Sequence, residues 1–535
     1  MIPFSMPFSP TFWWARSRVR RQLVAPAVAA LGAGMVWLVG WRGPDIPAQV
    51  YRVSLFRTHG FVLWDNGWYG GHYQLPYSVL FPPVGALIGL YGAAMLSAAV
   101  AAWAFGALIE DHFGRRAMAA SILFAIGTAG SVAIGQLPFL AGEAVGLMAL
   151  LAAQRRKPIA AVVLAIACPL MSPVAGAFLM LAFMAWALTS PRLSRLWLVA
   201  LVGIIAAPLL VMRIVFPSSG PFPFLGIDLA LIVAICTIGY MWLPVSQRAL
   251  RVGLVLYGLT AIAVFCFPNP IGGNIIRLSV GFGPAIIVAL ASLYRRRTLL
   301  IFTVPLLVWQ LSPAVGAIVV STQDQSASAP AYYQPLISEL SHQPELGRVE
   351  IPFTRSHWEA AYVAPQIPLA RGWERQTDMN DNPLFYDTDL LTAASYRTWL
   401  DETGVSWIAL PDVDLDYSAQ AEARLIEAGQ SYLEPVWHNA HWRLFKVLSS
   451  PGLATGPARL VSLHPDEVVV DATGAGTTTL RVRYTPAFNV VSGPACVGPS
   501  KGPWTEIISS GTGRVVIDTT LLRHDNDCPT SGSTG

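Results

Sequence analysis

Apolar segments about as long as a bilayer is thick dominate the first 322 residues of this chain. A helix needs about 20 apolar residues to cross the hydrocarbon core of a membrane, and segments of this kind predict about eleven crossings. The predicted spans are residues 22–41, 77–109, 117–136, 138–153, 158–171, 173–189, 195–216, 224–244, 250–267, 274–294 and 299–320. The pattern predicts a mostly α-helical, polytopic membrane bundle formed by residues 1–322.

The composition agrees with a membrane protein. Of the 535 residues, 54% are hydrophobic and 12% are charged, whereas a soluble globular chain carries about 25% charged residues. The formal net charge is +4, and the basic residues cluster between apolar segments. Nucleic-acid binding needs a basic face on a soluble fold, so we expect a lipid bilayer and no nucleic acid among the partners.

Two of the predicted spans need a finer interpretation. The segment 77–109 is too long for one crossing, and we expect Pro82 and Pro83 to separate a re-entrant or interfacial piece from the true span. The apolar segment from Leu23 to Trp41 follows several arginines, as a signal peptide would. Because it is long for a signal peptide and many spans follow, we interpret it as the first membrane helix.

The basic residues also predict an orientation, because cytoplasmic loops are enriched in Lys and Arg. With the N-terminus inside, the basic clusters fall in the cytoplasmic loops. They are Arg115–Arg116, Arg155–Lys157, Arg192 with Arg195, Arg248 with Arg251, and Arg295–Arg297. The loop 42–76 and everything after residue 322 then lie outside. We expect a bacterial plasma-membrane protein whose C-terminal part is extracytoplasmic.

The C-terminal part resembles a soluble protein and divides again. Residues 323–450 mix strand-like and helix-like segments, which predicts an α/β domain. Residues 451–457 are rich in Gly and Pro and are expected to form a linker. Short alternating segments in 458–528 predict a small β-sandwich, with a hairpin turn at Gly474, and residues 529–535 are expected to be disordered. Outside the cytoplasm, Cys496 and Cys528 are free to form a disulfide.

The first outside loop, residues 42–76, is the most informative place for function, because it is far longer than a simple connector. Asp45 follows the first span closely, near the level of lipid headgroups. We expect it to take a proton from an acceptor hydroxyl or to bind a divalent cation, Mg²⁺ or Mn²⁺. The other candidates for binding in this loop are Arg52, His59, Asp65, Trp68, Tyr69 and His72. The aromatic residues could stack on a sugar, although an interfacial aromatic belt explains them at least as well.

Three further candidates lie near the outside ends of later spans. Arg277 is about one turn into its helix, and its planar guanidinium suits a phosphate. Asn274 and the Gly272–Gly273 turn precede it and offer donors for an anion. Glu143 lies within an apolar span and should have a partner or line a cavity. The alternative for Arg277 is a structural role in which its side chain reaches to the lipid headgroups. The alternative for Glu143 is a structural hydrogen bond to a neighbouring helix.

These segments resemble the bacterial polytopic membrane proteins that are grouped with the GT-C glycosyltransferases. The resemblance rests on PDIPAQVYR and WDNGWYGGHYQLPYSVLFPP in the first loop, GGNIIRL in the late loop, and ARGWERQTDMNDNPLFY in the tail. The chain is most similar to a branch of large membrane proteins, some described as related to a pterin synthase membrane domain. By resemblance, Asp45 would be the base or metal ligand and Arg277 a contact to the donor phosphate. GT-C enzymes often carry paired acidic residues in this loop, whereas Ile46 follows Asp45 here.

The resemblance implies a glycosyltransferase that takes a sugar from a polyprenyl-phosphate donor. Its acceptor would be a cell-envelope glycan or protein on the outer side of the plasma membrane. One alternative is a transporter, which should carry paired charged residues at midplane and two related halves. Another is a non-catalytic scaffold whose exterior domains bind envelope glycan. The tail segment Arg371–Tyr386 would close over the membrane site or form a surface loop.

Overall fold

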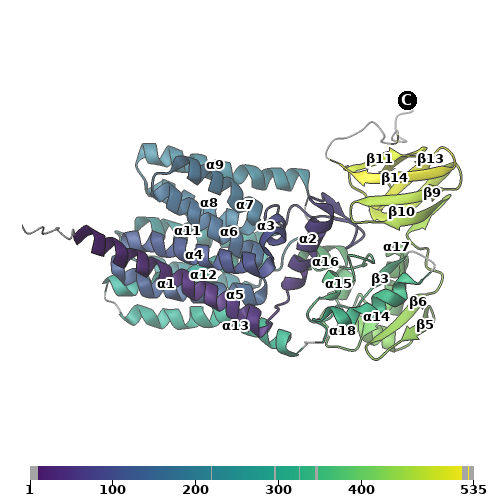
Figure 1. Cartoon of the computed structure of the whole chain (residues 1–535), viewed down its shortest axis with the longest axis horizontal. Coiled ribbons are helices and arrows are strands. Elements are labelled where there is room, and N and C mark those ends of the chain that lie inside the picture. Colours follow the sequence, from purple (N-terminus) through teal and green to yellow (C-terminus); the bar gives the residue numbers. More distant parts are fainter. Residues whose placement is uncertain are drawn as a thin grey trace, which may run out of the picture. The chain divides into compact units, whose positions relative to one another are not determined.

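The computed structural model describes residues 10–217, 220–294, 297–323, 326–343, 347–520 and 528. Arg295, Arg296 and the predicted disordered tail 529–535 lie outside the described residues. The chain forms two compact units (Figure 1). Unit 1 comprises residues 1–43, 78–214 and 222–319, and unit 2 comprises residues 44–77, 215–221 and 320–535. The first outside loop therefore folds with the C-terminal part of the chain.

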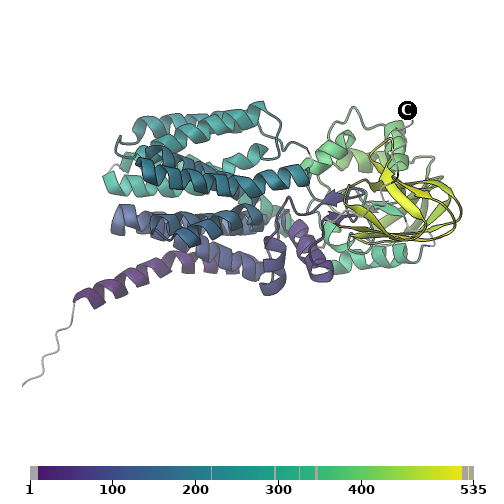
Figure 2. The ribbon, with the colours of Figure 1, turned by 90° about the horizontal axis from the view of Figure 1, so that it is seen from above.

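Unit 1 is a bundle of helices that run roughly side by side (Figure 2). Its α-helices are α1 (Pro10–Val39), α3 (Phe81–Ile88), α4 (Leu90–Phe113), α5 (Met118–Ile134), α6 (Leu137–Gln154), α7 (Pro158–Met171), α8 (Pro173–Thr189), α9 (Arg192–Val215), α10 (Gly226–Trp242), α11 (Arg248–Cys266), α12 (Ile276–Tyr294) and α13 (Thr303–Gln323). Short 3₁₀ turns are η1 (Gly114–Ala117), η2 (Gly272–Ile275) and η3 (Arg297–Phe302).

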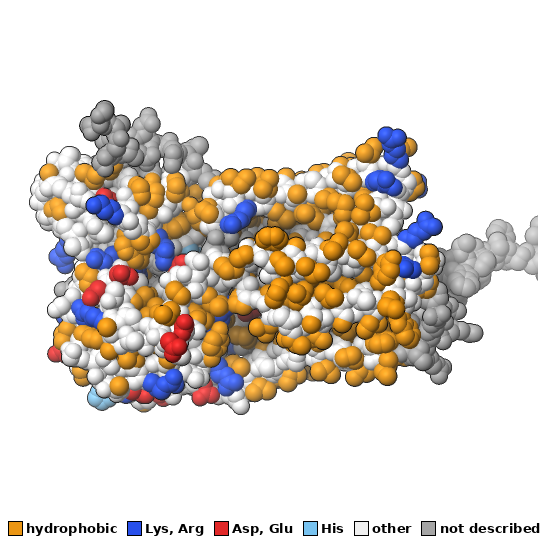
Figure 3. Space-filling model, turned by 180° about the vertical axis from the view of Figure 1, so that it is seen from behind, with side chains coloured by type: hydrophobic (Ala, Val, Ile, Leu, Met, Phe, Trp, Pro, Cys, Tyr) orange, Lys and Arg blue, Asp and Glu red, His pale blue; other side chains and the backbone are white. Residues whose placement is uncertain are grey.

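Among the described residues, 7 helices are long and apolar enough to cross a membrane. They lie within Arg21–Val39, Leu90–Phe113, Leu137–Gln154, Arg192–Val215, Arg248–Cys266, Gly272–Ser292 and Leu300–Gln323. Four more apolar helices, α5, α7, α8 and α10, are shorter. Hydrophobic side chains cover the flank of the bundle (Figure 3), as they do where a helical surface faces lipid. The expected count of about eleven crossings stays a prediction.

The long apolar segment after the first loop does break into two helices, but not at the expected residues. Pro82 and Pro83 lie in the first turn of α3, where a proline removes no intrahelical hydrogen bond. The break falls at Gly89, whose φ of 79° ends α3 before α4 begins. The prediction that the prolines form the boundary is wrong, because glycine adopts positive φ without the steric cost that other residues meet.

Several loops that the sequence assigns to the outside gather at one end of unit 1. Gly43 packs against the backbone carbonyls of Ala133 and Ile134 at the end of α5. The Ser78 hydroxyl donates to the carbonyl of Met171, at 2.7 Å. Because α6 begins at Leu137, its first turns share this end. The start of α12 lies here too, since the Arg277 guanidinium is 5.0 Å from the centre of the Phe139 ring.

Unit 2 begins with the first loop and continues with an α/β domain. The loop contains α2 (Ile46–His59) and a two-stranded ribbon of β1 (Trp64–Asp65) and β2 (His72–Tyr73). The domain contains α14 (Pro330–Ser341), β3 (Arg348–Glu350), α15 (Glu359–Tyr362), α16 (Arg375–Asp381), η4 (Pro383–Phe385), α17 (Ala393–Thr403), β4 (Val405–Pro411), α18 (Gln420–Glu427), β5 (Leu433–His438) and β6 (Trp442–Val447). Its strands form one sheet in the order β3-β4-β6-β5, with β3 parallel to β4.

Local sequence explains the central elements of this domain. Every residue of β4 is buried, which its continuous apolar sequence predicts for an inner strand. Thr392 and Ser395 form a reciprocal capping box at the start of α17, and Gly404 ends the helix with a φ of 68°. The mixture of strands and helices expected for residues 323–450 is therefore confirmed.

Residues 454–519 form two four-stranded antiparallel sheets over one apolar core. The strands are β7 (Ala454–Thr455), β8 (Ala458–Leu463), β9 (Glu467–Ala472), β10 (Gly476–Arg483), β11 (Phe488–Ser492), β12 (Ala495–Pro499), β13 (Trp504–Ser509) and β14 (Gly513–Thr519). The turn at Gly474 joins strands of different sheets, so the expected hairpin there is wrong. The expected disulfide is present between Cys496 and Cys528, with Cα atoms 5.0 Å apart.

Candidate functional sites

Asp45 begins the first candidate site, at the point where the chain enters α2. It is half-buried and takes the position before the first helical residue, Ile46. Its side chain does not cap the helix, although an aspartate is well suited to that position. Its intermediate burial leaves Asp45 partly accessible.

Asp65, by contrast, is a structural centre of the first loop. Its side chain is 0% exposed. It accepts hydrogen bonds from the Tyr51 hydroxyl at 2.9 Å, the Gly67 amide at 2.9 Å and the Gln74 amide at 2.7 Å. His72 lies 4.0 Å away. A buried carboxylate with this many donors fixes the loop conformation, so we assign Asp65 and His72 to folding.

The aromatic candidates Trp68 and Tyr69, and the neighbouring Trp64, are also buried, which differs from both interpretations drawn from the sequence. Trp68 is 0% exposed and stacks between Tyr51 and His72, with ring centres 4.3 Å and 5.4 Å away. Trp64 packs in the core of the β-sandwich. Tyr69 is buried and donates to the carbonyl of Gly372 at 2.5 Å. These rings pack inside unit 2, where they offer no face for a sugar and no belt for lipid headgroups.

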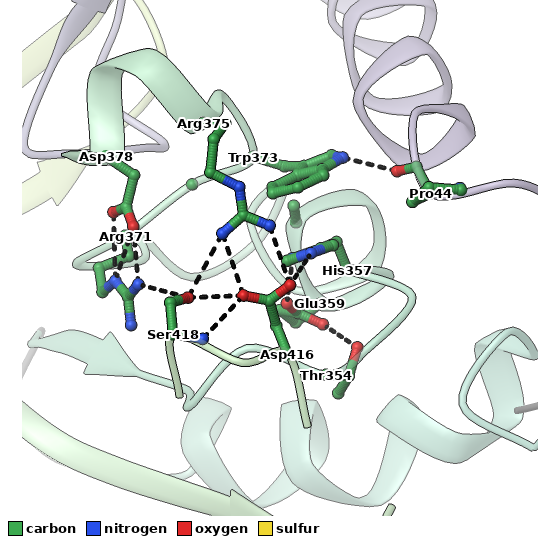
Figure 4. A network of polar contacts seen from close by, with 12 residues as sticks. Pro44, Thr354, His357, Glu359, Arg371, Trp373, Arg375, Asp378, Asp416 and Ser418 are labelled. Atoms are coloured by element: carbon green, nitrogen blue, oxygen red, sulfur yellow. Dashed lines mark hydrogen bonds and ion pairs between the residues drawn. The ribbon is translucent and has the colours of Figure 1, made fainter. Parts of the chain in front are cut away.

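One segment of the α/β domain, residues 371–378, holds the first loop in place, and we call it the clasp. The Trp373 indole N–H donates to the carbonyl of Pro44 at 2.6 Å, directly before Asp45 (Figure 4). Glu374 pairs with Arg52, which the sequence had suggested for donor binding. Arg52 is 3% exposed and its guanidinium is paired with Glu374. We therefore assign Arg52 to the contact between the clasp and the first loop. His59 lies exposed at the end of α2 and bonds the neighbouring Thr58.

Behind Trp373 lies a network of charged side chains (Figure 4). His357 stacks on the Trp373 ring, with centres 3.4 Å apart, and faces Asp416 at 3.5 Å. Arg375 bonds both oxygens of Asp416, at 3.0 Å and 2.9 Å. Burial raises the pKa of Asp416, but the hydrogen bonds from His357 and Arg375 outweigh burial and hold that pKa well below its usual range. The ionised Asp416 fixes the network that supports Trp373.

The second candidate site is a cavity of about 800 Å³ within unit 1. Its wall is mostly apolar and includes Phe178 and Phe282, and the carboxylate of Glu143 contributes one of its few charged groups. Glu143 lies in the second turn of α6, and Arg277 in the first turn of α12 is its electrostatic partner. The expectation that Glu143 lines a cavity is confirmed, and it has a partner as well.

The turn before Arg277 does not supply the free backbone donors that the sequence suggested. The Gly272 amide donates to Asn269 Oδ1, the Gly273 amide to the carbonyl of Pro223, and the Asn274 amide to the carbonyl of Ile271, all within 3.0 Å. Since each donor is already used within the loop, an anion at this turn would depend on the Arg277 side chain.

The structure thus assigns the sequence candidates to different parts of the molecule. Asp45, Arg52, Asp65, Trp68, Tyr69 and His72 belong to unit 2, whereas Glu143, Asn274 and Arg277 belong to unit 1. Sequence reasoning missed the individual roles of His357 and Asp416, which no motif marks. It did single out the segment that contains Trp373 and Glu374 by its density of charged and aromatic residues.

The described residues contain no group of three or more His, Cys, Asp or Glu side chains that could hold a metal ion. The expected Mg²⁺ or Mn²⁺ site at Asp45 stays a prediction, and we assign no step to a metal. Comparison with models of protein families finds no match, and comparison with curated proteins finds none either.

Proposed function

We propose that this chain is a membrane glycosyltransferase. It would transfer a sugar from a polyprenyl-phosphate donor to a cell-envelope glycan or protein acceptor. The observation that carries the proposal is the apolar cavity of about 800 Å³ in unit 1, with the Glu143 and Arg277 pair beside it. A ligand that fits this chemistry has a long hydrocarbon part and an anionic group.

The cavity wall favours the hydrocarbon part. Each CH₂ group transferred from water to an apolar site contributes about 0.8 kcal/mol, and the volume lies in the range of ligand pockets, about 300–1,000 Å³. A polar solute would leave its hydrogen-bonding groups unpaired against such a wall. The lining therefore supports a lipid ligand over the polar cargo of most transporters.

Arg277 is the group that we assign to the donor phosphate. A guanidinium presents paired N–H donors that match two phosphate oxygens. Glu143 would orient this guanidinium and keep its charge in an apolar environment. Both residues lie within two turns of the helix ends, where a lipid headgroup is expected.

Asp45 is the group that we assign to the acceptor. Its carboxylate would take the proton from the acceptor hydroxyl as the hydroxyl oxygen forms a bond to the anomeric carbon of the sugar. The bond between that carbon and the phosphate oxygen breaks, and the polyprenyl phosphate leaves with both electrons. Trp373 would hold the backbone of Pro44, and so the start of α2, during this step.

Two observations support an extracytoplasmic location for the C-terminal part. The disulfide between Cys496 and Cys528 suits an oxidising compartment. The basic loops alternate with loops that carry few basic residues, as the positive-inside rule requires. We therefore propose a plasma-membrane protein with a cytoplasmic N-terminus and transfer on the outer side.

The test uses the full chain in lipid nanodiscs, supplied with polyprenyl-phosphate sugars and envelope acceptors. Asp45→Asn keeps the size of the side chain but removes the base, and should lower the transfer rate by about 100-fold or more. Arg277→Lys keeps the charge but loses the paired donors, and should raise the donor KM by about tenfold.

The matched control is Asp471→Asn, the same change at an exposed carboxylate of the β-sandwich, which should transfer at the wild-type rate. Wild-type transfer by Asp45→Asn would contradict the role of Asp45. Movement of the lipid across the bilayer with no transfer of any sugar would favour a lipid carrier instead.

A further inference from the structure

A second group of charged side chains lies inside the α/β domain, at the base of the clasp. It consists of Arg371, Asp378, Glu350 and Glu422, each no more than 1% exposed. The charges come from different elements: Glu350 ends β3, Asp378 lies in α16 and Glu422 in α18. Buried charges of this kind are costly unless they are paired or neutralised.

Arg371 and Asp378 form the paired part of this cluster. Arg371 donates through Nε and Nη2 to the two oxygens of Asp378, at 3.1 Å and 2.6 Å. The guanidinium also lies between the rings of Phe353 and Phe385, each 3.9 Å from its central carbon. One carboxylate and two aromatic rings therefore contact this side of the guanidinium, and Nη2 also donates to the Ser418 hydroxyl at 3.5 Å.

Glu350 and Glu422 both face the remaining nitrogen of the Arg371 guanidinium, Nη1. Their carboxylates lie 3.7 Å and 3.4 Å from Nη1 of Arg371. Tyr396 donates to Glu422 at 2.8 Å, whereas neither oxygen of Glu350 accepts a hydrogen bond from an N–H or O–H donor of the described residues. The two carboxyl groups are within hydrogen-bonding reach of each other, and such a bond needs a proton on one of them.

The charge balance requires the same proton. Three buried carboxylates face one guanidinium, so full ionisation would leave two uncompensated negative charges in the interior. Burial, and then the neighbouring carboxylate, raises the pKa of Glu350 well above its usual range. Burial likewise raises the pKa of Glu422 to about 7. The titratable or charged groups that face the pair are Arg371, Asp378 and Tyr396, with Tyr386 bonded to Asp378.

The clasp connects this cluster to the first loop. Arg371 and Asp378 are its two ends, and between them Trp373 bonds Pro44 and Glu374 pairs with Arg52. We propose that Glu350 and Glu422 share a proton that anchors the clasp, so that loss of this proton above neutral pH loosens the hold on the first loop. The inference concerns unit 2 alone and is independent of the proposed transfer.

The direction of the raised pKa determines how pH affects the hold of the clasp on the first loop. We call the clasp closed when it holds the first loop and open when it releases it. A carboxyl group whose pKa is raised in the closed state binds its proton more tightly there. It therefore stabilises the closed state at low pH and stabilises it less as pH rises. A proton that the closed state holds and the open state releases makes the opening equilibrium constant rise with pH across the neutral range, by up to about tenfold for each pH unit.

The experiment measures amide hydrogen exchange of the peptide 371–386 in the full chain in nanodiscs, corrected for the intrinsic effect of pH on exchange. We expect the wild-type protein to lose roughly tenfold in protection between about pH 6 and about pH 8.5. Glutamine mimics a protonated glutamate, so Glu350→Gln with Glu422→Gln leaves Arg371 and Asp378 balanced and should change less than about twofold. If the double variant does not fold, Glu422→Gln alone should still reduce the loss.

The control is Glu427→Gln, an exposed glutamate at the end of α18, which should keep the wild-type loss of protection. Equal protection of the wild-type peptide at both pH values would overturn the proposal. A wild-type loss in the double variant would overturn it as well, because the proton would then lie elsewhere.

Discussion

At the scale of single residues, burial separates structural carboxylates from candidate catalytic ones. Asp65 and Asp45 belong to the same loop and look alike in sequence. Asp65 is 0% exposed and accepts bonds from three side-chain or backbone partners, whereas Asp45 is half-buried and does not cap its helix. Burial excludes Asp65 from contact with a substrate, whereas Asp45 is partly exposed. The sequence shows the residue type, but the surrounding donors decide its role.

We therefore expect Asp65→Asn to act on stability. The new amide group would place N–H donors against the Gly67 and Gln74 donors that now serve the carboxylate. Breaking a buried network of this kind should lower the free energy of unfolding of unit 2 by about 2–4 kcal/mol. Denaturant unfolding followed by hydrogen exchange of the first loop would measure it. A change no larger than that of the exposed control Glu427→Gln would contradict this assignment.

At the scale of elements, the contact between the clasp and the first loop depends on a close approach of two backbones. Gly372 lies directly on Trp68, and a Cβ at Gly372 would clash with the ring, 2.4 Å from its Cγ atom. Since Trp68 is completely buried between Tyr51 and His72, it has no space to move aside. The glycine is thus needed for packing.

Gly372→Ala should consequently destabilise the clasp by about 1–3 kcal/mol, the usual range for overpacking in a dense core. Increased hydrogen exchange in both 371–378 and 64–72 would report the loss, because the two segments separate together. Gly474→Ala is the matched control, since a Cβ there meets open space. Similar exchange in the two variants would show that the contact tolerates a methyl group.

At the scale of the whole molecule, the sequence predicts the helices and strands, because these depend on local patterns of apolar residues, but not the contacts between distant segments. Hydropathy located the helices of unit 1 closely, and period-two alternation located strands such as β9 and β14. The pairing of the first loop with the clasp was not predictable, because Pro44 and Trp373 are 329 residues apart and no periodicity links them. The same holds for the cavity, whose wall comes from residues spread between Phe105 and Trp309.

The central claim is that the cavity of unit 1 binds the lipid part of the donor. Ala234 lines this cavity on α10, and Ala234→Trp would fill part of it, whereas Val199→Trp adds the same side chain on the exposed surface of α9. The most direct measurement is the affinity of each variant for a polyprenyl phosphate in nanodiscs. We predict that Ala234→Trp raises the Kd by about tenfold or more and that Val199→Trp leaves it unchanged. Equal affinity of the wild-type protein and both variants would contradict the claim.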